Sequence, residues 1–428
     1  MAIKINSDGS WQAEYLGPYA GLHVQAPATN IPDNASPAFN NFMLRNAELR
    51  SRPNFAQYPG GSIPGYPLGV TTFLDANGNY HAVTWEADQL YQYAPSVPGW
   101  VDVGTASPGN MEYNPVNYQA FANILYYTNV GIITYGPHVP GGGKPPVITP
   151  FMAYWDGIAA APVYTQTYSD ASTSNSIAGI SLTNSPTVGG SLPGAPTIVG
   201  PISIGAAYLA ELDDQLILGN VTILDQGTGK IYNFPNLIWW SANGLPLQWD
   251  PTENVSAGFN PFLDVSDQIT GLAMLGVAGY IFRNYGITQM APTGQAITPW
   301  EFDHMWASNH GIGNVLAWSL AQYGPTCCFV AQDNIYSLSI TNVQPIGGTA
   351  RDAIMSDLAN AAGPSFANII PILVSGFTYL TYQLEIPFVT FIRIYLYSFE
   401  DQNWSTWDEP IAQSNPPLPQ LTCAPNVV

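Results

Sequence analysis

The chain consists of short apolar segments that alternate with polar turns. In residues 269–340, apolar runs of strand length are broken by Gly, Asp or Asn. Residues 334–340 alternate polar and apolar side chains with period two, which is typical of a strand with one buried face. Gly and Pro occur 40 and 38 times, and both favour turns over helices. The pattern predicts an all-β protein with very little helix.

Two short sequence patterns, called phrases below, recur along the chain and indicate an internal repeat. The first is an acidic turn followed by an apolar strand, and it occurs at Asp88, Asp214 and Asp333. The second is a Tyr followed seven residues later by a Trp, and it occurs at Tyr93 with Trp100 and at Tyr397 with Trp404. We interpret each phrase as one position that recurs in successive copies of a structural unit.

We take the start of one apolar strand in each repeat as its anchor, and the chain contains six such anchors. They are Leu90, Met152, Leu216, Ile287, Ile335 and Ile394. Their spacing is irregular and centres on about sixty residues, which is enough for four short strands per copy. A four-stranded sheet cannot bury both faces alone, so the copies must stack, and radial stacking gives a propeller. The sequence therefore predicts a six-bladed β-propeller.

The repeats divide the chain into three parts. We expect an extended N-terminal segment with a hairpin over residues 1–55, the propeller over 56–410 and a C-terminal tail over 411–428. Within the propeller, residues 163–200 are rich in Ser, Thr, Gly and Pro, which predicts an insertion that is either a flap or a functional loop. The one helix is expected within residues 349–371.

The N-terminal segment combines prolines with a cluster of basic residues. Five prolines keep residues 1–55 extended, and the sequence around Asn46 and Ala47 predicts a hairpin of two short strands. Three arginines fall in or beside this hairpin, namely Arg45, Arg50 and Arg52. In so acidic a chain they predict a patch for docking to a neighbouring subunit or an adaptor protein. Solubility of the hairpin is the alternative, and the sequence leaves both open.

The charge balance excludes whole classes of partner. The chain has 29 acidic and 9 basic residues, a formal net charge of −20, and charged residues make up only 9% of it. Such a surface repels nucleic acid and anionic membranes, because phosphate neutralisation needs Lys and Arg. An uncharged polar surface suits a protein that neighbours cover in an assembly, although a secreted β-protein remains a second interpretation. No apolar run is long enough to span a membrane, and the N-terminus lacks the apolar stretch of a signal peptide.

The sequence offers little for metal or cofactor chemistry. Cys327 and Cys328 are adjacent within a predicted strand, so we interpret them as small apolar core residues, and Cys423 stands far from them. The five histidines are scattered without metal-ligand spacing. We therefore expect no metal, no cofactor and no catalytic residues, and hence a protein that is not an enzyme.

Sugar chemistry on a propeller is the main alternative. Trp239, Trp240 and Trp249 could stack on sugar rings, although aromatic residues in strands more often fill the space between blades. A glycosidase needs two carboxyl groups, one of them buried to raise its pKa. The candidates are Asp213 with Asp214, Glu301 with Asp303, and Glu400 with Asp401. A carboxylate at a recurring turn is more simply explained as a residue that caps the turn.

Four segments, in order along the chain, resemble the β-propeller nozzle or hub proteins of short-tailed bacteriophages. Residues 17–55 resemble the opening of that group, with spaced prolines, an Asn-rich hairpin and a closing Arg-Ser-Arg-Pro. Residues 236–251 resemble its Trp-Ser and Pro-x-x-Trp blade, and residues 271–290 and 326–348 resemble a later pair of blade sequences. Two departures stand out, since Ala20 replaces a glycine of the opening and Asn334 replaces a turn glycine.

The resemblance implies a structural component of the virion. It implies a hexameric ring below the portal and adaptor, made in the host cytoplasm, with contacts to tail fibre or needle proteins. DNA would pass through an acidic channel without specific binding, during genome retention and ejection. A receptor-binding tail protein and a carbohydrate-binding or glycoside-cleaving propeller are the alternatives.

Overall fold

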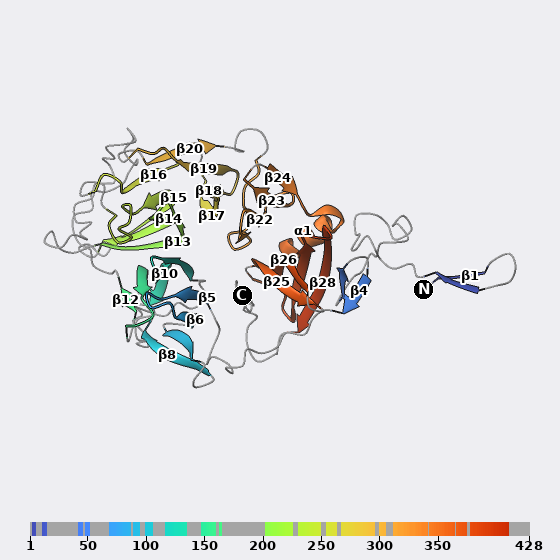
Figure 1. Ribbon diagram of the computed structural model, residues 1–428. Coiled ribbons are helices and arrows are strands. Elements are labelled where there is room, and N and C mark those ends of the chain that lie inside the picture. Colours follow the sequence, from blue (N-terminus) through green and yellow to red (C-terminus); the bar gives the residue numbers. More distant parts are fainter. Residues whose placement is uncertain are drawn as a thin grey trace, which may run out of the picture. The chain divides into compact units, whose positions relative to one another are not determined.

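The computed structural model contains six four-stranded antiparallel sheets, which are the blades of a six-bladed β-propeller (Figure 1). The predicted all-β fold and the predicted number of blades are both confirmed. The structure describes residues 2–5, 11–14, 42–45, 48–51, 68–86, 89–94, 99–105, 116–134, 147–159, 162–164, 202–225, 230–249, 254–262, 267–295, 299–304, 311–340, 342–363, 365–374 and 377–410.

The first three blades take up residues 69–261. Blade 1 comprises β5 (Gly69–Leu74), β6 (Tyr80–Glu86), β7 (Gln89–Ala94) and β8 (Gly99–Thr105). Blade 2 comprises β9 (Asn117–Phe121), β10 (Ile124–Thr134), β11 (Val147–Trp155) and β12 (Val163–Tyr164). Blade 3 comprises β13 (Ile202–Leu212), β14 (Gln215–Asp225), β15 (Lys230–Trp240) and β16 (Gly258–Pro261).

The last three blades take up residues 269–410. Blade 4 comprises β17 (Ile269–Leu275), β18 (Ala278–Arg283), β19 (Ile287–Pro292) and β20 (Trp300–His304). Blade 5 comprises β21 (Ala321–Tyr323), β22 (Thr326–Val330), β23 (Ile335–Ser339) and β24 (Asn342–Pro345). Blade 6 comprises β25 (Phe366–Val374), β26 (Phe377–Pro387), β27 (Phe391–Ser398) and β28 (Asn403–Pro410). In every blade the strands are neighbours in chain order, so no blade borrows a strand from another.

The chain divides into two compact units. One unit consists of Gln57–Ala317 with Gln420–Val428 and holds blades 1 to 4. The other consists of Met1–Ala56 with Trp318–Pro419 and holds blades 5 and 6. The start of the chain therefore belongs to the same unit as its last two blades.

The recurring Tyr and Trp occupy equivalent positions, as predicted. Tyr93 faces Trp100 across β7 and β8, and Tyr397 faces Trp404 across β27 and β28. The ring centroids lie 5.8 Å apart in the first pair and 5.3 Å apart in the second. Each pair thus joins the third and fourth strands of its blade.

The recurring acidic turn is not a single position, and this part of the repeat prediction is wrong. Asp88 and Asp333 precede the third strands β7 and β23, whereas Asp214 lies between the first and second strands of blade 3. The anchor Leu216 is likewise in the second strand β14, while the other five anchors are in third strands. An acidic residue suits any tight turn before a strand, so this phrase marks turns without marking their place in the repeat.

The predicted helix is present but short. The helix α1 (Arg351–Ala359) follows the 3-10 turn η2 (Gly348–Ala350) and buries Ile354. It ends at Asn360, before Ala361, which the apolar spacing had assigned to the helix. The side-chain amide of Asn360 donates to the Ser356 carbonyl at 2.7 Å, which helps the last turn to close.

The N-terminal hairpin also forms as predicted. The strands β3 (Phe42–Arg45) and β4 (Glu48–Ser51) pair around a two-residue turn. A second hairpin, which the sequence pattern did not predict, pairs β1 (Ala2–Ile5) with β2 (Trp11–Glu14). Residues 165–200 of the predicted insertion and the predicted tail over 411–428 lie outside the described residues, and the proposed domain boundaries stay predictions.

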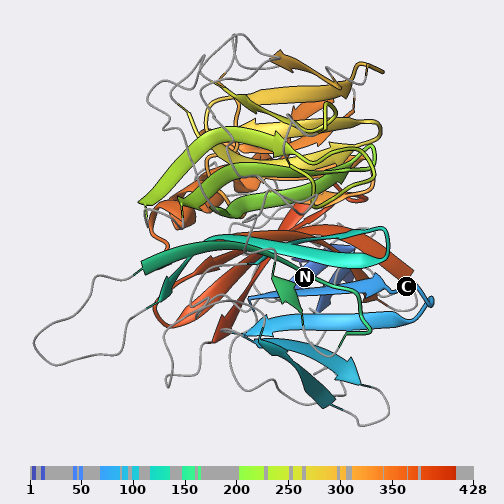
Figure 2. The ribbon, with the colours of Figure 1, turned by 90° about the vertical axis from the view of Figure 1, so that its left-hand side faces the viewer.

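Blade 3 shows how the sequence bends a blade. Its strands β13, β14 and β15 each have 11 residues, and they curve visibly (Figure 2). The pairing of β14 with β15 shifts between Gly219 and Val221, and Asn220 there takes φ 56°. A β-bulge of this kind increases the local twist of the strand.

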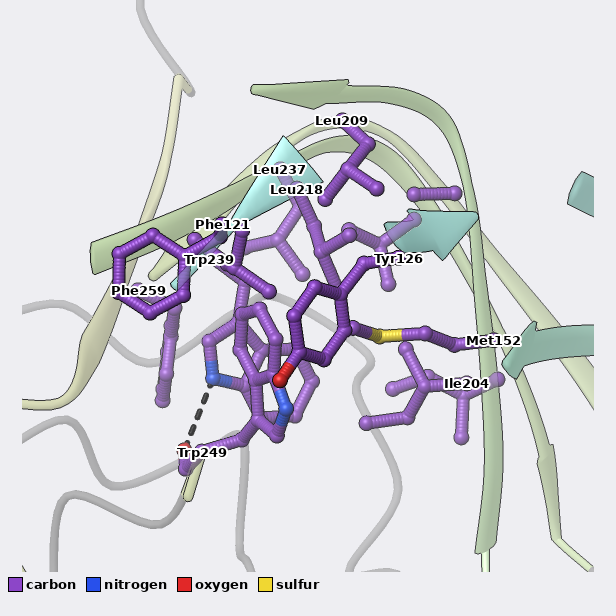
Figure 3. Close-up of a cluster of buried hydrophobic side chains, with 14 residues drawn as sticks. Phe121, Tyr126, Met152, Ile204, Leu209, Leu218, Leu237, Trp239, Trp249 and Phe259 are labelled. Carbon is purple, nitrogen blue, oxygen red and sulfur yellow. Dashed lines mark hydrogen bonds between the residues drawn. The ribbon is translucent and has the colours of Figure 1, made fainter. Parts of the chain in front are cut away.

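The core between blades 2 and 3 is aromatic. Trp239 and Trp249 are almost fully buried, and the indole N–H of Trp239 donates to the Trp249 carbonyl at 2.9 Å (Figure 3). Phe259 and Tyr126 pack in the same cluster with aliphatic residues of β13 and β14. Trp240 is also buried. The three tryptophans therefore serve as core residues, as the strand pattern favoured.

Candidate functional site

The arginines whose side chains the structure describes are all engaged within the protein. Arg283 is buried, and its guanidinium lies over the ring of Phe262 at 5.3 Å. Arg351 donates from Nε to the Asp333 carbonyl at 2.7 Å. Arg393 is held by two carboxylates. Each of these three arginines thus has a partner within the protein, and the side chain of Arg351 is also 44% exposed.

Arg393 forms the most elaborate of these contacts. Its Nε and one terminal nitrogen donate to the two carboxylate oxygens of Asp408 at 2.8 and 3.0 Å, and the other terminal nitrogen donates to Asp357 at 3.1 Å. The Tyr395 hydroxyl donates to the same Asp357 oxygen at 2.6 Å. The hydrogen bonds that Arg393 donates to Asp408 raise the pKa of Arg393, and burial raises the pKa of Tyr395. The contacts tie α1 to the outer strands of blade 6, a link that the sequence pattern did not reveal.

Carboxylates, in contrast, are exposed on several blades. Those with exposed side chains in the described residues are Asp102, Asp213, Asp214, Glu301, Asp303, Asp333, Asp352 and Glu400. Most lie on hairpins or on outer strands, where water solvates them. With the described arginines engaged, the described surface is strongly acidic.

The tip of the first hairpin in blade 3 consists of two aspartates. Asp213 and Asp214 both take positive φ, at 50° and 59°, which is the backbone of a type I′ turn. The Asp214 carbonyl accepts the backbone N–H of Gly244 at 2.8 Å, and the Asn243 amide donates to the Asp213 carbonyl at 3.2 Å. The tip is thus held by the loop after β15, while both carboxylates face solvent.

The carboxylate pairs that the sequence offered as glycosidase candidates do not form buried acid sites. Asp213, Asp214, Glu301, Asp303 and Glu400 are exposed. The sixth candidate, Asp401, is half-buried. Its carboxylate accepts the hydroxyl of Ser398 at 3.1 Å, as expected for a residue in a turn. These positions therefore lack the buried, apolar surroundings of a general acid.

A buried Asp–His pair lies in the first hairpin of blade 1. Asp75 accepts the backbone N–H groups of Asn77 and Asn79 at 2.8 Å each, and its second oxygen lies 3.1 Å from Nε2 of His81. The side-chain amide of Asn79, together with those N–H groups and His81, lowers the pKa of Asp75 against the opposing effect of burial. Nδ1 of His81 lies 2.8 Å from the amide nitrogen of Gln92, so the ring is held at both nitrogens.

The Asp–His pair also lies at the seam where blade 1 packs against blade 2. The His81 ring stacks on Phe73 at 5.1 Å and meets Trp155 of blade 2 edge-on at 5.4 Å. A Cβ on Gly157 would lie 2.7 Å from Nε2 of His81, so blade 2 approaches the ring closely. The sequence signal was the run Asp-x-Asn-x-Asn-x-His over residues 75–81.

The cysteines and histidines that the structure describes add no further site. Cys327 and Cys328 are fully buried, as predicted, and burial raises the pKa of the Cys328 thiol to about 12. Cys423 lies outside the described residues. Within the part of the chain that the structure describes, no group of three or more His, Cys, Asp or Glu could hold a metal ion. The same part contains no helix long and apolar enough to cross a membrane.

The predicted arginine patch falls on the N-terminal hairpin. Arg45 pairs in register with Glu48, and Arg50 pairs with Met43. Because paired residues share a face, Arg45 and Arg50 hold register positions on the same face of the ribbon. Arg52 lies outside the described residues. The docking role of these three residues stays a prediction.

Comparison with known proteins gives the fold and no family. No protein-family model matches the chain, and no curated protein matches it. The solved structure of YjhT is similar with a TM-score of 0.40 and 7% identity over 80% of this chain and 98% of that one. One of two prolyl endopeptidases is similar with a TM-score of 0.35 and 12% identity, over 81% of this chain and 42% of that one. The dihydro-heme d1 dehydrogenase NirN is similar with a TM-score of 0.37 and 8% identity, over 83% of this chain and 61% of that one.

These similarities correct one expectation. We expected that the chain is not an enzyme, yet the similar chains include a prolyl endopeptidase and a dehydrogenase. The identities and TM-scores of these similarities are so low that they assign no reaction to this chain.

Proposed function

We propose that the chain is a structural subunit of a bacteriophage tail, a nozzle or hub ring below the portal and adaptor through which the genome leaves. The observation that supports this proposal most is the distribution of charge. Eight described carboxylates are exposed, whereas the three arginines with described side chains are engaged within the protein. The formal net charge of −20 shows that the imbalance extends over the whole chain.

This distribution suits a wall along which DNA must slide. A protein grips DNA by neutralising phosphates with Lys and Arg, and each such contact adds affinity. An acidic wall repels the phosphates, so it would guide DNA without holding it. Genome retention and ejection both need a channel that does not bind DNA tightly, so that the DNA can slide through it.

The proposed partners follow from the ring. The subunits would assemble as a homo-oligomer, in the proposal a hexamer, and would dock to the adaptor and to tail fibre or needle proteins. The hairpin arginines Arg45, Arg50 and Arg52 are the proposed docking residues, because opposite charges steer association in an otherwise acidic chain. The proposed location is the virion, after synthesis in the host cytoplasm.

Native mass spectrometry tests this proposal. The purified protein is measured alone, and then with the portal–adaptor complex of the same virus. We expect six copies on the portal–adaptor ring and no retention of duplex DNA at low salt. A matched variant with Arg45, Arg50 and Arg52 changed to Gln should dock more weakly, while a variant with Arg351→Gln should dock normally.

Two outcomes would overturn the proposal. The first is a stable monomer that ignores the portal–adaptor complex. The second is tight, salt-sensitive DNA binding, since an acidic wall cannot provide it. A sugar-binding propeller would instead show glycan binding, but Trp239, Trp240 and Trp249 are buried and offer no stacking surface.

A further inference from the structure

The outer strand of the last blade is buried to an unusual degree. In β28, four consecutive side chains are buried, namely Trp404, Ser405, Thr406 and Trp407. Successive residues of a strand point to opposite faces, so this strand is covered on both. Three other outer strands are far more open, since β8 exposes Val101 at 45% and β20 and β24 each expose three side chains.

One face of β28 is covered by blade 5 and α1. The indole N–H of Trp404 donates to the Ile346 carbonyl, just after β24, at 2.7 Å. Asp408, two register positions further along on the same face, holds Arg393, which also binds Asp357 of α1. These contacts explain the burial of Trp404 and Thr406.

The other face carries Trp407, which is fully buried, and Ser405. Their partners on β27 are Ile394 and Leu396, which are 3% and 1% exposed. The strand β3 of the N-terminal hairpin contacts β28 in the same compact unit, although it forms a sheet of its own (Figure 1).

Chain topology gives this contact a structural role. In each described blade the four strands come from one continuous segment of the chain, and the hairpin β3–β4 forms a separate sheet. The hairpin lies at the start of the chain and contacts the last strand of the last blade. We propose that β3–β4 is a latch, which seats the beginning of the chain on the outer strand of blade 6 and shields that strand from other partners.

The shielding has a physical motive. An open outer strand offers unpaired N–H and C=O groups to any other chain, which favours edge-to-edge association. The other outer strands are shorter or interrupted, since β12 has two residues, β16 and β24 have four each, β20 has five, and β8 carries a bulge. At eight residues β28 is the longest described outer strand, so it has most need of a cover.

A specific cleavage test probes the latch in the full chain. A protease site is inserted between Gly60 and Gly61, after the hairpin and before β5, and the cleaved protein is measured by native mass spectrometry. We expect the N-terminal fragment to stay bound to its own chain at low protein concentration. Loss of the fragment after cleavage would overturn the latch.

Two proline variants test whether the hairpin itself provides the cover. Met43→Pro breaks β3, because Pro removes a ladder N–H and fixes φ near −65°. Gln12→Pro makes the same change in β2 and serves as the control. Met43→Pro should release the cleaved fragment and speed amide exchange in residues 403–410 by at least about tenfold, whereas Gln12→Pro should do neither.

Residues 278–283 in β18 of the other unit report whether a variant is folded. If they keep their protection and residues 403–410 do not respond to Met43→Pro, the proposal is wrong. If Met43→Pro prevents folding, the cleaved protein with the natural hairpin still decides the question. Mixing isotope-labelled and unlabelled copies before cleavage distinguishes the latch from an exchanged hairpin, since mixed masses would place the hairpin on a second copy and overturn the intrachain assignment.

Discussion

At the scale of single residues, Asp75 holds the first hairpin of blade 1 together. Its carboxylate accepts two backbone N–H groups and the Asn79 side-chain amide, and it also contacts Nε2 of His81. Those hydrogen bonds favour the ionised form and lower the pKa of Asp75 below its ordinary value of 3.8. The seam between blades 1 and 2 therefore depends on one ionised group.

This dependence predicts the response to acid. A carboxyl whose pKa is lower in the folded than in the unfolded state stabilises the fold above the unfolded pKa and ceases to do so as pH falls through the folded pKa. We expect Asp75→Asn to unfold at lower urea concentration than the natural protein at pH 5, with the difference narrowing below about pH 4. Urea midpoints measured from pH 5 to pH 2 check this. The control Asp303→Asn, at an exposed position on β20, should change little, and a gap for Asp75→Asn that is constant with pH would contradict the prediction.

At the scale of elements, hairpin tips show where local sequence and local backbone disagree. Asn-Gly is the preferred pair for a type I′ turn because both residues must take positive φ. Blade 3 places Asp213 and Asp214 there instead, and blade 2 places Ala122 and Asn123 at 49° and 64°. Side chains with a Cβ pay a conformational penalty in this region, so these tips are less stable than they could be.

A glycine should therefore stabilise the tip of blade 3. We expect Asp214→Gly to raise the free energy of unfolding by about 0.5–1 kcal/mol, because relief of the left-handed backbone outweighs the entropy of glycine in the unfolded chain. The backbone carbonyl that accepts the Gly244 N–H is kept in this variant. Asp303→Gly removes the same charge from an extended strand and should instead lower the free energy of unfolding by about 0.5–1 kcal/mol. Urea unfolding at pH 7 measures the free energy of unfolding of both variants. If both changes had the same sign, the loss of charge rather than the backbone conformation would determine the stability of the tip.

Elements also show what the sequence alone could predict. Period-two alternation was enough for the all-β fold, and the spacing of six strand starts gave the blade count even though Leu216 lies in a second strand. The Tyr–Trp spacing succeeded because it reflects pairing between adjacent strands. The acidic turns failed as repeat markers, since a turn before a second strand and a turn before a third strand need the same chemistry. The Arg393 cluster joins residues far apart in the chain, and no local pattern encodes such a contact.

At the scale of the whole molecule, the formal charge of −20 links stability to the proposed function. Uncompensated carboxylates repel one another in the compact state, and salt screens that repulsion. The expected consequence is a melting temperature that rises with NaCl, mostly between about 0.01 M and 0.15 M, where the Debye length falls from about 30 Å to about 8 Å. Thermal unfolding followed by circular dichroism at fixed pH 7 measures the rise, and KCl in place of NaCl should act equally because screening does not depend on the cation.

A variant that replaces Asp213, Asp214, Glu301 and Asp303 by Asn or Gln should show a smaller rise in melting temperature, since fewer charges remain to be screened. If salt instead lowered the melting temperature, attractive ion pairs such as that of Arg393 would dominate the electrostatics, and the acidic surface would lose its place as the main support for a DNA-repelling wall.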